Sequence, residues 1–529
     1  MSLKKKMRLK KFNLHPITTY ILMTFGVLIL SWFLSIIGFQ STYTTVRPEN
    51  LELESVFVSA KNMLNYDGIK YIISNAASNF ASFAPLVSLL ISLIGLSVAH
   101  ASGLIDTYIK RVTLKISNRK LTFIIILIAI LSSLINDVGY VILIPLSALL
   151  FMANGRSPLL GIVSAFSGVA FGYGCTFFVG TMEVNLIPLT TSASRLIDPQ
   201  FHISLTSNLF IMIAFSIILA MVGTIVIENI VVKKLGKYKP SLEETQEIQK
   251  IILPVKEEQK KIELEINEKK GLKYAYTVCI VMILMFIYMI TPNFPGSGML
   301  LDMGEDTYLR QLFGPNSYFQ DGFTYMVSLL FLFTGLAYGI GAKTLKSDKD
   351  LIEKSSEYVR NIGVLMALLF FASQFIAVFK ETNIGTVITS IGANLIKDLS
   401  FSGIPLILLV LLVILVSNLF LTSPVSKWQI LSPVVVPLMM QSNISPQFAQ
   451  FILRAGDSIT KGITPLLAYF VIYLGYLNIY NKDNEPITIR KAISYVVPCC
   501  IAFGLTWCLL LVGWYLLGLP IGPGVFPTL

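Results

Sequence analysis

Charged residues are scarce in this sequence. Only 13% of its 529 residues are charged, whereas 54% are hydrophobic, and the mean hydropathy is +0.72. Soluble globular domains contain roughly 25% charged residues. The shortage of charge, together with several apolar runs of about 20 residues, excludes an ordinary soluble domain and predicts an integral membrane protein.

Residues suited to catalysis and metal binding are also few. The three histidines, His15, His100 and His202, occupy terminal or loop-edge positions, and the five cysteines lie in apolar runs without a CxxC pair. Disulfide and zinc chemistry are therefore not expected, and an intramembrane enzyme would lack its nucleophile, base or metal cluster. No Walker-type glycine-rich loop is present, which disfavours ATP-driven transport within this chain. We predict a protein that is not an enzyme and that holds no cofactor.

The basic residues lie beside the apolar runs. The formal net charge is +11, and the basic residues cluster in short links such as MSLKKKMRLKK and DTYIKRVTLKISNRK. Such links are typical of the cytosolic side of a membrane protein, so nucleic-acid binding is a poor interpretation. The pattern indicates a multi-pass protein of the cell membrane.

The apolar runs predict an all-α fold of nine transmembrane helices and two re-entrant hairpins. The predicted spans are residues 17–39, 85–105, 158–180, 205–231, 273–291, 322–341, 362–380, 449–474 and 492–518. Two further apolar regions, 121–151 and 403–440, are interrupted by polar residues and followed by prolines. We expect each of these regions to enter the membrane and return on the same side.

The distribution of basic residues predicts the orientation. It places the basic N-terminal segment 1–16 in the cytosol and the acidic loop 40–84 outside. The lysine-rich segment 233–272 stays in the cytosol only if 121–151 is a hairpin. The same reasoning places the loop 292–320 and the C-terminus outside, and it makes the second hairpin open outward. The two hairpins are therefore oppositely oriented.

Opposed hairpins predict an inverted repeat. Each hairpin region contains a Ser- or Asn-bearing break, a proline-marked return helix and then a long span with central glycines. The expected segments are a cytosolic N-terminus (1–16), scaffold helices (17–105), a first half with its hairpin (106–232), a charged cytosolic linker (233–272), scaffold helices with an external loop (273–361), and a second half (362–529).

One apolar span contains three charges, in the run RAGDSITKGIT. Arg454, Asp457, Ser458 and Lys461 are spaced so that a helix places all four on one face. Charges at membrane depth face the protein interior, a water cavity or each other. One interpretation is a structural ion pair of Asp457 with Arg454 or Lys461. The other, which nearby glycines and a proline favour, is that this face lines a path for a substrate or a cation.

The two hairpin breaks contain compact oxygen donors. They are Ser132, Ser133, Asn136 and Asp137 in the first hairpin and Ser417, Asn418, Thr422 and Ser423 in the second. Small oxygen donors beside unwound backbone are what hard cations such as sodium prefer. The same residue types also cap broken helices, so a set of caps is the alternative. Two such clusters in opposed hairpins favour a cation site.

Longer motifs follow one another along nearly the whole chain. They are SSLINDVGYVILIPLSALLF, GRSPLLGIVSAFSGVAFGYG, SPVSKWQILSPVVVP, RAGDSITKGITPLLAYF and LLGLPIGPG. In this order they resemble the AbgT family, named for p-aminobenzoyl-glutamate transport. The resemblance implies a homodimer of nine-span, two-hairpin protomers and secondary transport driven by a sodium or proton gradient. Members have been associated with uptake of p-aminobenzoyl-glutamate and with export of p-aminobenzoate-like antimetabolites, including sulfonamides.

The resemblance also marks individual positions. They are Asp137 in the first hairpin and Asn418, Trp428, Pro446, Arg454 and Asp457 in the second half. Asp137 and Asp457 are candidates for cation coordination or proton carriage. Asn418 is a candidate neutral ligand, which makes Asn418 and Asp457 the predicted metal ligands. Trp428 would stack on an aromatic ring, and Arg454 would hold a carboxylate. Pro446 is included among the substrate-binding residues, although a helix start is the more ordinary role for such a proline.

The sequence departs from the family pattern at three positions. Asn136 stands where a serine commonly precedes the hairpin aspartate, Thr176 lies near a usual asparagine, and Glu183 replaces an aspartate. We expect Thr176 to contact the substrate, and Asn136 to act with Ser133 in cation coupling.

Trp428 also has an alternative interpretation. Its neighbour in the sequence is Lys427, and a tryptophan beside a lysine is typical of an anchor at the membrane interface.

Together these patterns predict a cation-coupled secondary transporter of small aromatic carboxylates that works by alternating access. Its partners would be p-aminobenzoyl-glutamate or p-aminobenzoate-like compounds, the lipid membrane and a second copy of the chain. Two alternatives stay open. One is export of p-aminobenzoate-like drugs, such as sulfonamides, by proton antiport. The other is an ion channel built on the same hairpins.

Overall fold

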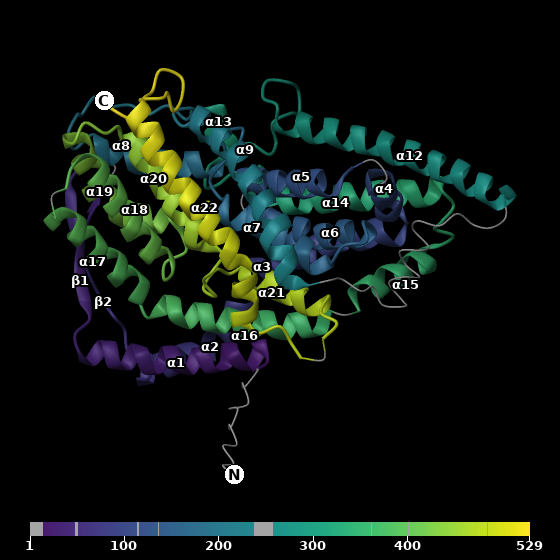
Figure 1. The fold of residues 1–529 in the computed structure, drawn as a ribbon, viewed down its shortest axis with the longest axis horizontal. Helices are drawn as coiled ribbons and strands as arrows, with labels where there is room; N and C mark the ends of the chain where they lie inside the picture. Colours follow the sequence, from purple (N-terminus) through teal and green to yellow (C-terminus); the bar gives the residue numbers. More distant parts are fainter. Residues whose placement is uncertain are drawn as a thin grey trace, which may run out of the picture.

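Helices make up most of the regular structure of the chain. The computed structural model describes residues 14–47, 51–113, 116–135, 137–236, 258–360, 362–399, 401–483 and 485–529. Figure 1 shows the helices packed side by side, with α18, α19 and α20 towards one end of the molecule and α4, α12 and α15 towards the other.

The N-terminal part combines helices with a β-hairpin. Its elements are α1 (Pro16–Ile36), β1 (Gln40–Val46), β2 (Leu53–Ser59), α2 (Tyr66–Ala81), α3 (Ala84–Ala101) and α4 (Leu104–Thr113). The strands pair antiparallel, with Gln40 opposite Ser59. Both contain β-branched and aromatic residues, which favour strands. The predicted 40–84 loop and the purely α-helical fold are therefore wrong here, because this segment forms a hairpin and a helix.

The next group begins with the predicted first hairpin. It comprises α5 (Asn118–Leu131), the short 3-10 helix η1 (Ser132–Leu134), α6 (Val138–Ala153), α7 (Pro158–Phe171), α8 (Thr181–Ser194), α9 (Leu209–Val226), the π-helical turn η2 (Ile227–Val231) and α10 (Val232–Leu235). A middle group follows: α12 (Glu258–Ile290), α13 (Tyr308–Phe313), α14 (Tyr318–Gly341), α15 (Asp348–Val359), α16 (Ile362–Glu381) and α17 (Ile384–Leu399).

The last group contains the predicted second hairpin. It comprises α18 (Gly403–Asn418), α19 (Pro424–Gln441), α20 (Pro446–Lys461), α21 (Phe470–Ile479) and α22 (Ile489–Leu517). Elements α5 to α9 and α18 to α22 follow the same order, namely two helices around a polar break, a third helix, a second break, a short helix and a long apolar helix. The halves also pack crosswise, because α8 contacts α19, α21 contacts α6 and α7 contacts α20.

Seven helical segments in the described part of the chain are long and apolar enough to span a membrane. They are Pro16–Ile36, Tyr66–Ala101, Leu209–Leu235, Glu265–Ile290, Tyr318–Gly341, Ile362–Glu381 and Ile489–Leu517. Each overlaps one of the nine predicted spans. The protein is thus a mostly helical, multi-pass membrane protein.

The other two predicted spans, 158–180 and 449–474, are not continuous helices. In the first, α7 ends at Phe171 and α8 begins only at Thr181. In the second, α20 ends at Lys461 and α21 begins at Phe470. Glycines and a proline explain both breaks, because Gly174 has a φ of +89° and Pro465 lies between α20 and α21. These two spans are therefore broken, as the glycines and the proline within them indicate.

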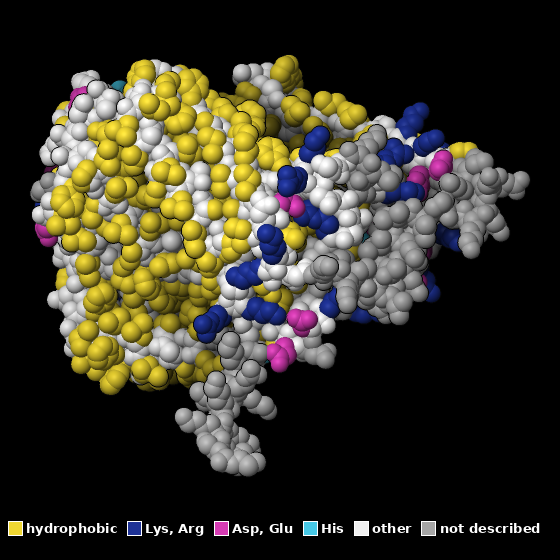
Figure 2. All heavy atoms as spheres, viewed as in Figure 1, with side chains coloured by type: hydrophobic (Ala, Val, Ile, Leu, Met, Phe, Trp, Pro, Cys, Tyr) yellow, Lys and Arg dark blue, Asp and Glu magenta, His cyan; other side chains and the backbone are white. Residues whose placement is uncertain are grey.

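A large apolar surface surrounds the helices. In α22, Leu505 and Leu509 are 61% and 74% exposed, whereas Trp507 on the inner side is fully buried. Figure 2 shows hydrophobic side chains over one broad face, with Lys and Arg side chains gathered along its border. An exposed apolar area of this extent is typical of a surface that lipid covers.

Helices α3 and α14 pack closely through small residues. The backbone N–H of Gly95 donates to Ser328 Oγ at 3.0 Å, and Ser328 Oγ donates to the Ile91 carbonyl at 2.6 Å. A Cβ at Gly95 would clash with the Ser328 backbone. Close contacts of this kind hold membrane helices together where the hydrophobic effect cannot.

We therefore expect Gly95→Ala to destabilise the protein by about 1–3 kcal/mol, because the added methyl group separates α3 from α14. The thermal unfolding temperature of the purified protein in detergent measures this effect. Gly26→Ala in α1 is the matched control, because a Cβ at Gly26 has nothing within 4 Å. Equal unfolding temperatures of the two variants would contradict the proposed packing role.

Candidate functional site

Helix α20 carries the polar face predicted from RAGDSITKGIT into the protein interior. It begins at Pro446, behind the N-cap Ser445, and it contains the whole run up to Lys461. Arg454, Asp457 and Ser458 are each 0% exposed. Pro446 occupies the first turn, eight residues before Arg454, or about 12 Å along the helix. The structure thus confirms one buried helix with all four polar residues and places Pro446 at the helix start.

Asp457 lies at the centre of a charged cluster. Its Oδ1 accepts a hydrogen bond from Lys427 Nζ at 2.5 Å, and its Oδ2 lies 3.4 Å from Lys461 Nζ. Lys427 Nζ also donates to Asn418 Oδ1. The Asn418 amide group in turn donates to the Asp457 carbonyl at 2.6 Å and to Thr460 Oγ1 at 3.1 Å. Helices α18, α19 and α20 therefore meet at Asp457.

Arg454 pairs with Glu183 rather than with Asp457. Its Nη1 donates to Glu183 Oε1, while Glu183 Oε2 accepts from the Gly180 backbone N–H at 2.8 Å, at the start of α8. Of the two partners offered as alternatives for Asp457, the structure shows Lys461 and not Arg454. The reason is that Arg454 points towards α8, in the other half of the chain.

The opposite edge of the Arg454 guanidinium group is unpaired. Both Nε and Nη2 are buried and have no hydrogen-bond partner among the described residues. The glycine-containing break at 172–180 passes close by, and a Cβ at Gly174 would lie 3.2 Å from Nε. Unpaired buried donors are costly, and these two together form a planar fork that matches a carboxylate.

Trp428 is part of the protein interior and links the two halves. It is 0% exposed, as is Lys427. Its Nε1 donates to Thr190 Oγ1 of α8 at 2.8 Å, and Thr190 Oγ1 donates to Gln450 Oε1 of α20 at 2.9 Å. The interfacial interpretation of Trp428 and Lys427 is therefore wrong, because neither side chain reaches the surface of the protein.

The first hairpin places a carboxylate without a local partner. Asp137 lies at the N-cap position of α6, yet its side chain makes no cap hydrogen bond, and its buried Oδ1 has no partner among the described residues. It lies within electrostatic reach of Lys461 and Asp457. By contrast, Ser423 does cap α19. The alternative of simple caps is thus confirmed for Ser423 but not for Asp137.

The remaining predicted residues lie near this hairpin. Ser133 Oγ donates to the Ile130 carbonyl at 2.8 Å and lies 3.4 Å from the Cys175 carbonyl. Thr176 Oγ1 donates to the Phe178 carbonyl at 2.5 Å, within the break between α7 and α8. Asn136 lies outside the described residues.

Six charged groups gather around the polar face of α20. The cations are Lys427, Lys461 and Arg454, and the anions are Asp457, Glu183 and Asp137. In their ionised forms the six charges sum to zero. Such compensation allows charges to remain in a medium of low dielectric constant.

Several of these contacts were not predicted from the sequence. Lys427, Thr190 and Gln450 were not assigned a role in the site. Lys427 carried the clearest signal, because a lysine inside an apolar hairpin region is costly unless it is paired. Thr190 and Gln450 gave no signal, since their contacts join residues 260 positions apart.

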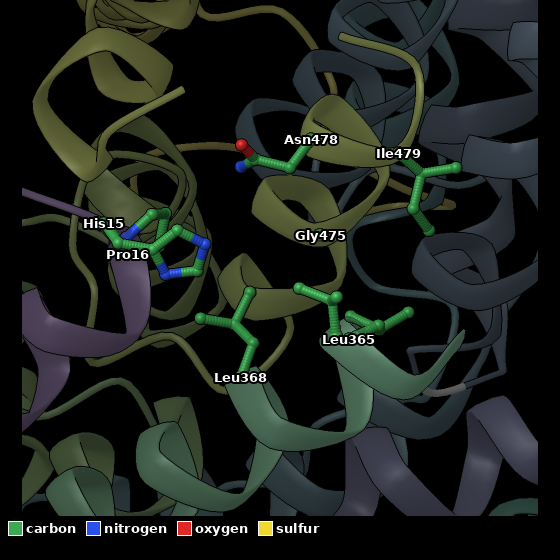
Figure 3. A pocket seen from close by; sticks show the side chains of 8 residues that line it. His15, Pro16, Leu365, Leu368, Gly475, Asn478 and Ile479 are labelled. Carbon is green, nitrogen blue, oxygen red and sulfur yellow. The ribbon is translucent and has the colours of Figure 1, made fainter. Parts of the chain in front are cut away.

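A separate cavity lies away from these charges. It has a volume of about 350 Å³ and lies between the start of α1, α16 and α21. Figure 3 shows its lining residues, which include His15, Leu365, Leu368 and Asn478. His15 caps α1 by accepting from the Ile17 N–H at 3.2 Å. None of the predicted site residues lines this cavity, so we do not take it as the functional site.

Comparison with known proteins identifies the family. Residues 11–529 match the model of the "AbgT putative transporter family". The chain is 28% identical over 515 residues to the p-aminobenzoyl-glutamate transport protein of Escherichia coli K12, which covers 97% of this chain and 94% of the relative.

Two solved structures are also similar. One is the YdaH transporter of Alcanivorax borkumensis, with 27% identity, a TM-score of 0.47, and coverage of 96% of this chain and 100% of that one. The other is Neisseria gonorrhoeae MtrF, described with a class of antimetabolite efflux pumps, with 30% identity, a TM-score of 0.47, and coverage of 97% and 98%. The match to the family model over nearly its whole length shows that this chain belongs to the AbgT family of membrane transporters.

Proposed function

We propose that this AbgT-family transporter moves small aromatic carboxylates by coupling them to a sodium or proton gradient. The Escherichia coli relative is named for p-aminobenzoyl-glutamate transport, which supports that compound as a substrate. We extend the proposal to p-aminobenzoate-like antimetabolites. Uptake and export by proton antiport, including export of sulfonamides, use the same site and differ in direction.

The unpaired edge of Arg454 is the observation that carries this proposal. A buried guanidinium group with Nε and Nη2 free offers a two-pronged site for a carboxylate, while its pair with Glu183 fixes its orientation. Trp428 would supply the surface on which the aromatic ring stacks. Because Trp428 is fully buried, the substrate would reach it only after α19 moves, as alternating access requires. Thr176 and Pro446 complete the proposed substrate-binding set.

The balance of positive and negative charges in the fully ionised cluster supports coupling. A cation that enters a buried cluster with a net charge of zero leaves an uncompensated positive charge, which is costly in the membrane interior. Entry of a carboxylate at Arg454 would restore neutrality. We therefore propose Asp137, with Ser133 and Asn136, and Asp457, with Asn418, as the cation-coupling groups. The unpaired Oδ1 of Asp137 favours it as a ligand.

We extend the proposal to the architecture. The crosswise packing of the two halves supports an inverted repeat with two re-entrant hairpins, a cytosolic N-terminus and an external C-terminus. The proposed segments are 1–16, the scaffold parts 17–105 and 273–361, the linker 233–272, and the transport halves 106–232 and 362–529. Two such chains would form a homodimer.

Flux into proteoliposomes tests the proposed function. The protein is reconstituted, and entry of labelled p-aminobenzoyl-glutamate and p-aminobenzoate is followed while sodium and proton gradients are imposed separately. We expect saturable flux that one inward gradient accelerates. Accumulation only against an opposed proton gradient would indicate antiport and favour export. Flux that neither saturates nor depends on a gradient would indicate a channel, and no flux of either compound would reject the substrate assignment.

We predict that Arg454→Lys lowers carboxylate transport without loss of folding. The lysine keeps the charge next to Glu183 but lacks the fork. A hydrogen bond to a charged group contributes about 1.5–3 kcal/mol, so kcat/KM should fall roughly tenfold or more. Arg156→Lys is the matched control, since Arg156 pairs with Glu228 at 2.7 Å outside the cluster. Equal flux in both variants would contradict the role of the fork.

We predict that Asp137→Asn abolishes the dependence of flux on the imposed gradient while the protein stays folded. The amide keeps the shape of the side chain but removes the charge that would bind a coupling cation. The gradient experiment above, with Asp198→Asn as a control at an exposed carboxylate, measures the effect. Gradient-driven flux at the wild-type rate would exclude Asp137 from coupling.

A further inference from the structure

Lys427 places its ammonium group between the two side chains that are predicted to bind a coupling cation. Its Nζ donates to Asn418 Oδ1 and, at 2.5 Å, to Asp457 Oδ1. All three side chains are fully buried. The two oxygens best suited to an alkali cation therefore already hold a cation that belongs to the chain.

An ammonium group and an alkali cation compete for the same ligands. Both are compact monovalent charges that bind carboxylate and amide oxygens. With Lys427 in place, a second cation at these oxygens would be repelled at short range by an ammonium group that water does not screen. A cation can use Asn418 and Asp457 fully only after Lys427 has left them.

We propose that Lys427 is a built-in competitor for the coupling cation. Its ammonium group holds the Asn418 and Asp457 oxygens in this conformation and leaves them when the transported cation binds. The inference rests on the proposed cation-coupled function. It assigns Lys427 a positioning role, which sets how strongly the cation binds and ties cation binding to a movement of α19.

Because Lys427 lies in α19, its release from Asp457 and Asn418 would move part of that helix. It lies in the first turn of the helix, directly after the cap formed by Ser423 and the break that follows α18. The next residue, Trp428, donates a hydrogen bond from its Nε1 to Thr190 Oγ1 of α8 at 2.8 Å. A displacement that frees Lys427 moves this turn and loosens the contact between Trp428 and Thr190. Cation exchange at Asp457 is thereby linked to the proposed substrate site.

Lys461 provides a matched control. It lies 3.4 Å from the other oxygen of Asp457, and its Nζ also sits 3.0 Å from the centre of the Tyr173 ring. Replacement of Lys461 by methionine removes the same charge from the cluster as replacement of Lys427. It nevertheless leaves Lys427 on Asp457 Oδ1 and Asn418 Oδ1. Comparison of the two variants therefore separates the loss of competition for the cation ligands from the loss of one positive charge in the cluster.

Sodium binding to the purified full-length protein tests the proposal. Sodium chloride is titrated against choline chloride at constant ionic strength, and the stabilisation of the folded protein against heat reports binding. We expect Lys427→Met to lower the half-saturating sodium concentration at least tenfold relative to both the wild type and Lys461→Met. The double variant Lys427→Met, Asp457→Asn should lose this gain. If Lys427→Met does not fold, Lys427→Gln serves in its place, because it removes the charge but still forms hydrogen bonds.

Two results would overturn the proposal. One is an unchanged sodium response on removal of the Lys427 charge. The other is an equal gain in Lys461→Met, which would attribute the effect to net charge alone. Failure of the transport function is distinguishable, because it is measured as flux. If flux depends on the gradient but Lys427→Met does not bind sodium more tightly, only the role of Lys427 as a competitor is rejected. If Lys427→Met binds sodium more tightly but flux does not depend on a gradient, only the proposed cation coupling of transport is rejected.

Discussion

The Asp457 carboxylate is the group on which the rest of the site depends. A carboxylate buried in an apolar interior needs counter-charges, and it receives them from Lys427 on α19 and from Lys461 on its own helix. Removal of one partner from such a pair leaves an uncompensated charge, which is strongly destabilising. The second hairpin must therefore approach α20 closely, and its break has to lie at the depth of Asp457. The carboxylate thus determines where the hairpin lies.

The same constraint explains the two broken helices. The polar face of α20 takes partners from residues 172–183 of the first half, where the Tyr173 carbonyl accepts from Ser458 Oγ and Glu183 pairs with Arg454. A continuous helix through 158–180 could not bring backbone carbonyls and Glu183 around α20, because its carbonyls would be used within the helix. The glycines free this segment from helical geometry, and the polar face of α20 supplies the partners that unwound backbone requires. The break at 172–180 and the charged face of α20 thus depend on each other.

The sequence predicted the long apolar helices and the charged face of α20, but not the contacts between halves. A single apolar stretch of bilayer length satisfies its backbone hydrogen bonds in the membrane only as a helix, so α1, α9 and α22 could be recognised directly from the sequence. The glycines and the proline indicated weakened spans, but hydropathy does not locate the ends of a break, because a glycine-containing segment such as 172–180 remains apolar. The β-hairpin was missed because its strands are only seven residues each and lie in a segment that was interpreted as an external loop. The pairing of Arg454 with Glu183 was not predicted, because Glu183 lies 271 residues away and one sequence does not reveal such pairs.

The crosswise contacts bear on how two sites can influence each other. Lys427 and Trp428 are consecutive residues in one helical turn, yet the first binds Asp457 and the second binds Thr190 of α8. A packed helical turn moves as a unit, so a change at one contact alters the geometry of the other. The free energy that couples two ligands arises when both favour or oppose the same movement. In this fold the coupling needs no long pathway, because one turn of α19 joins the proposed cation and substrate sites.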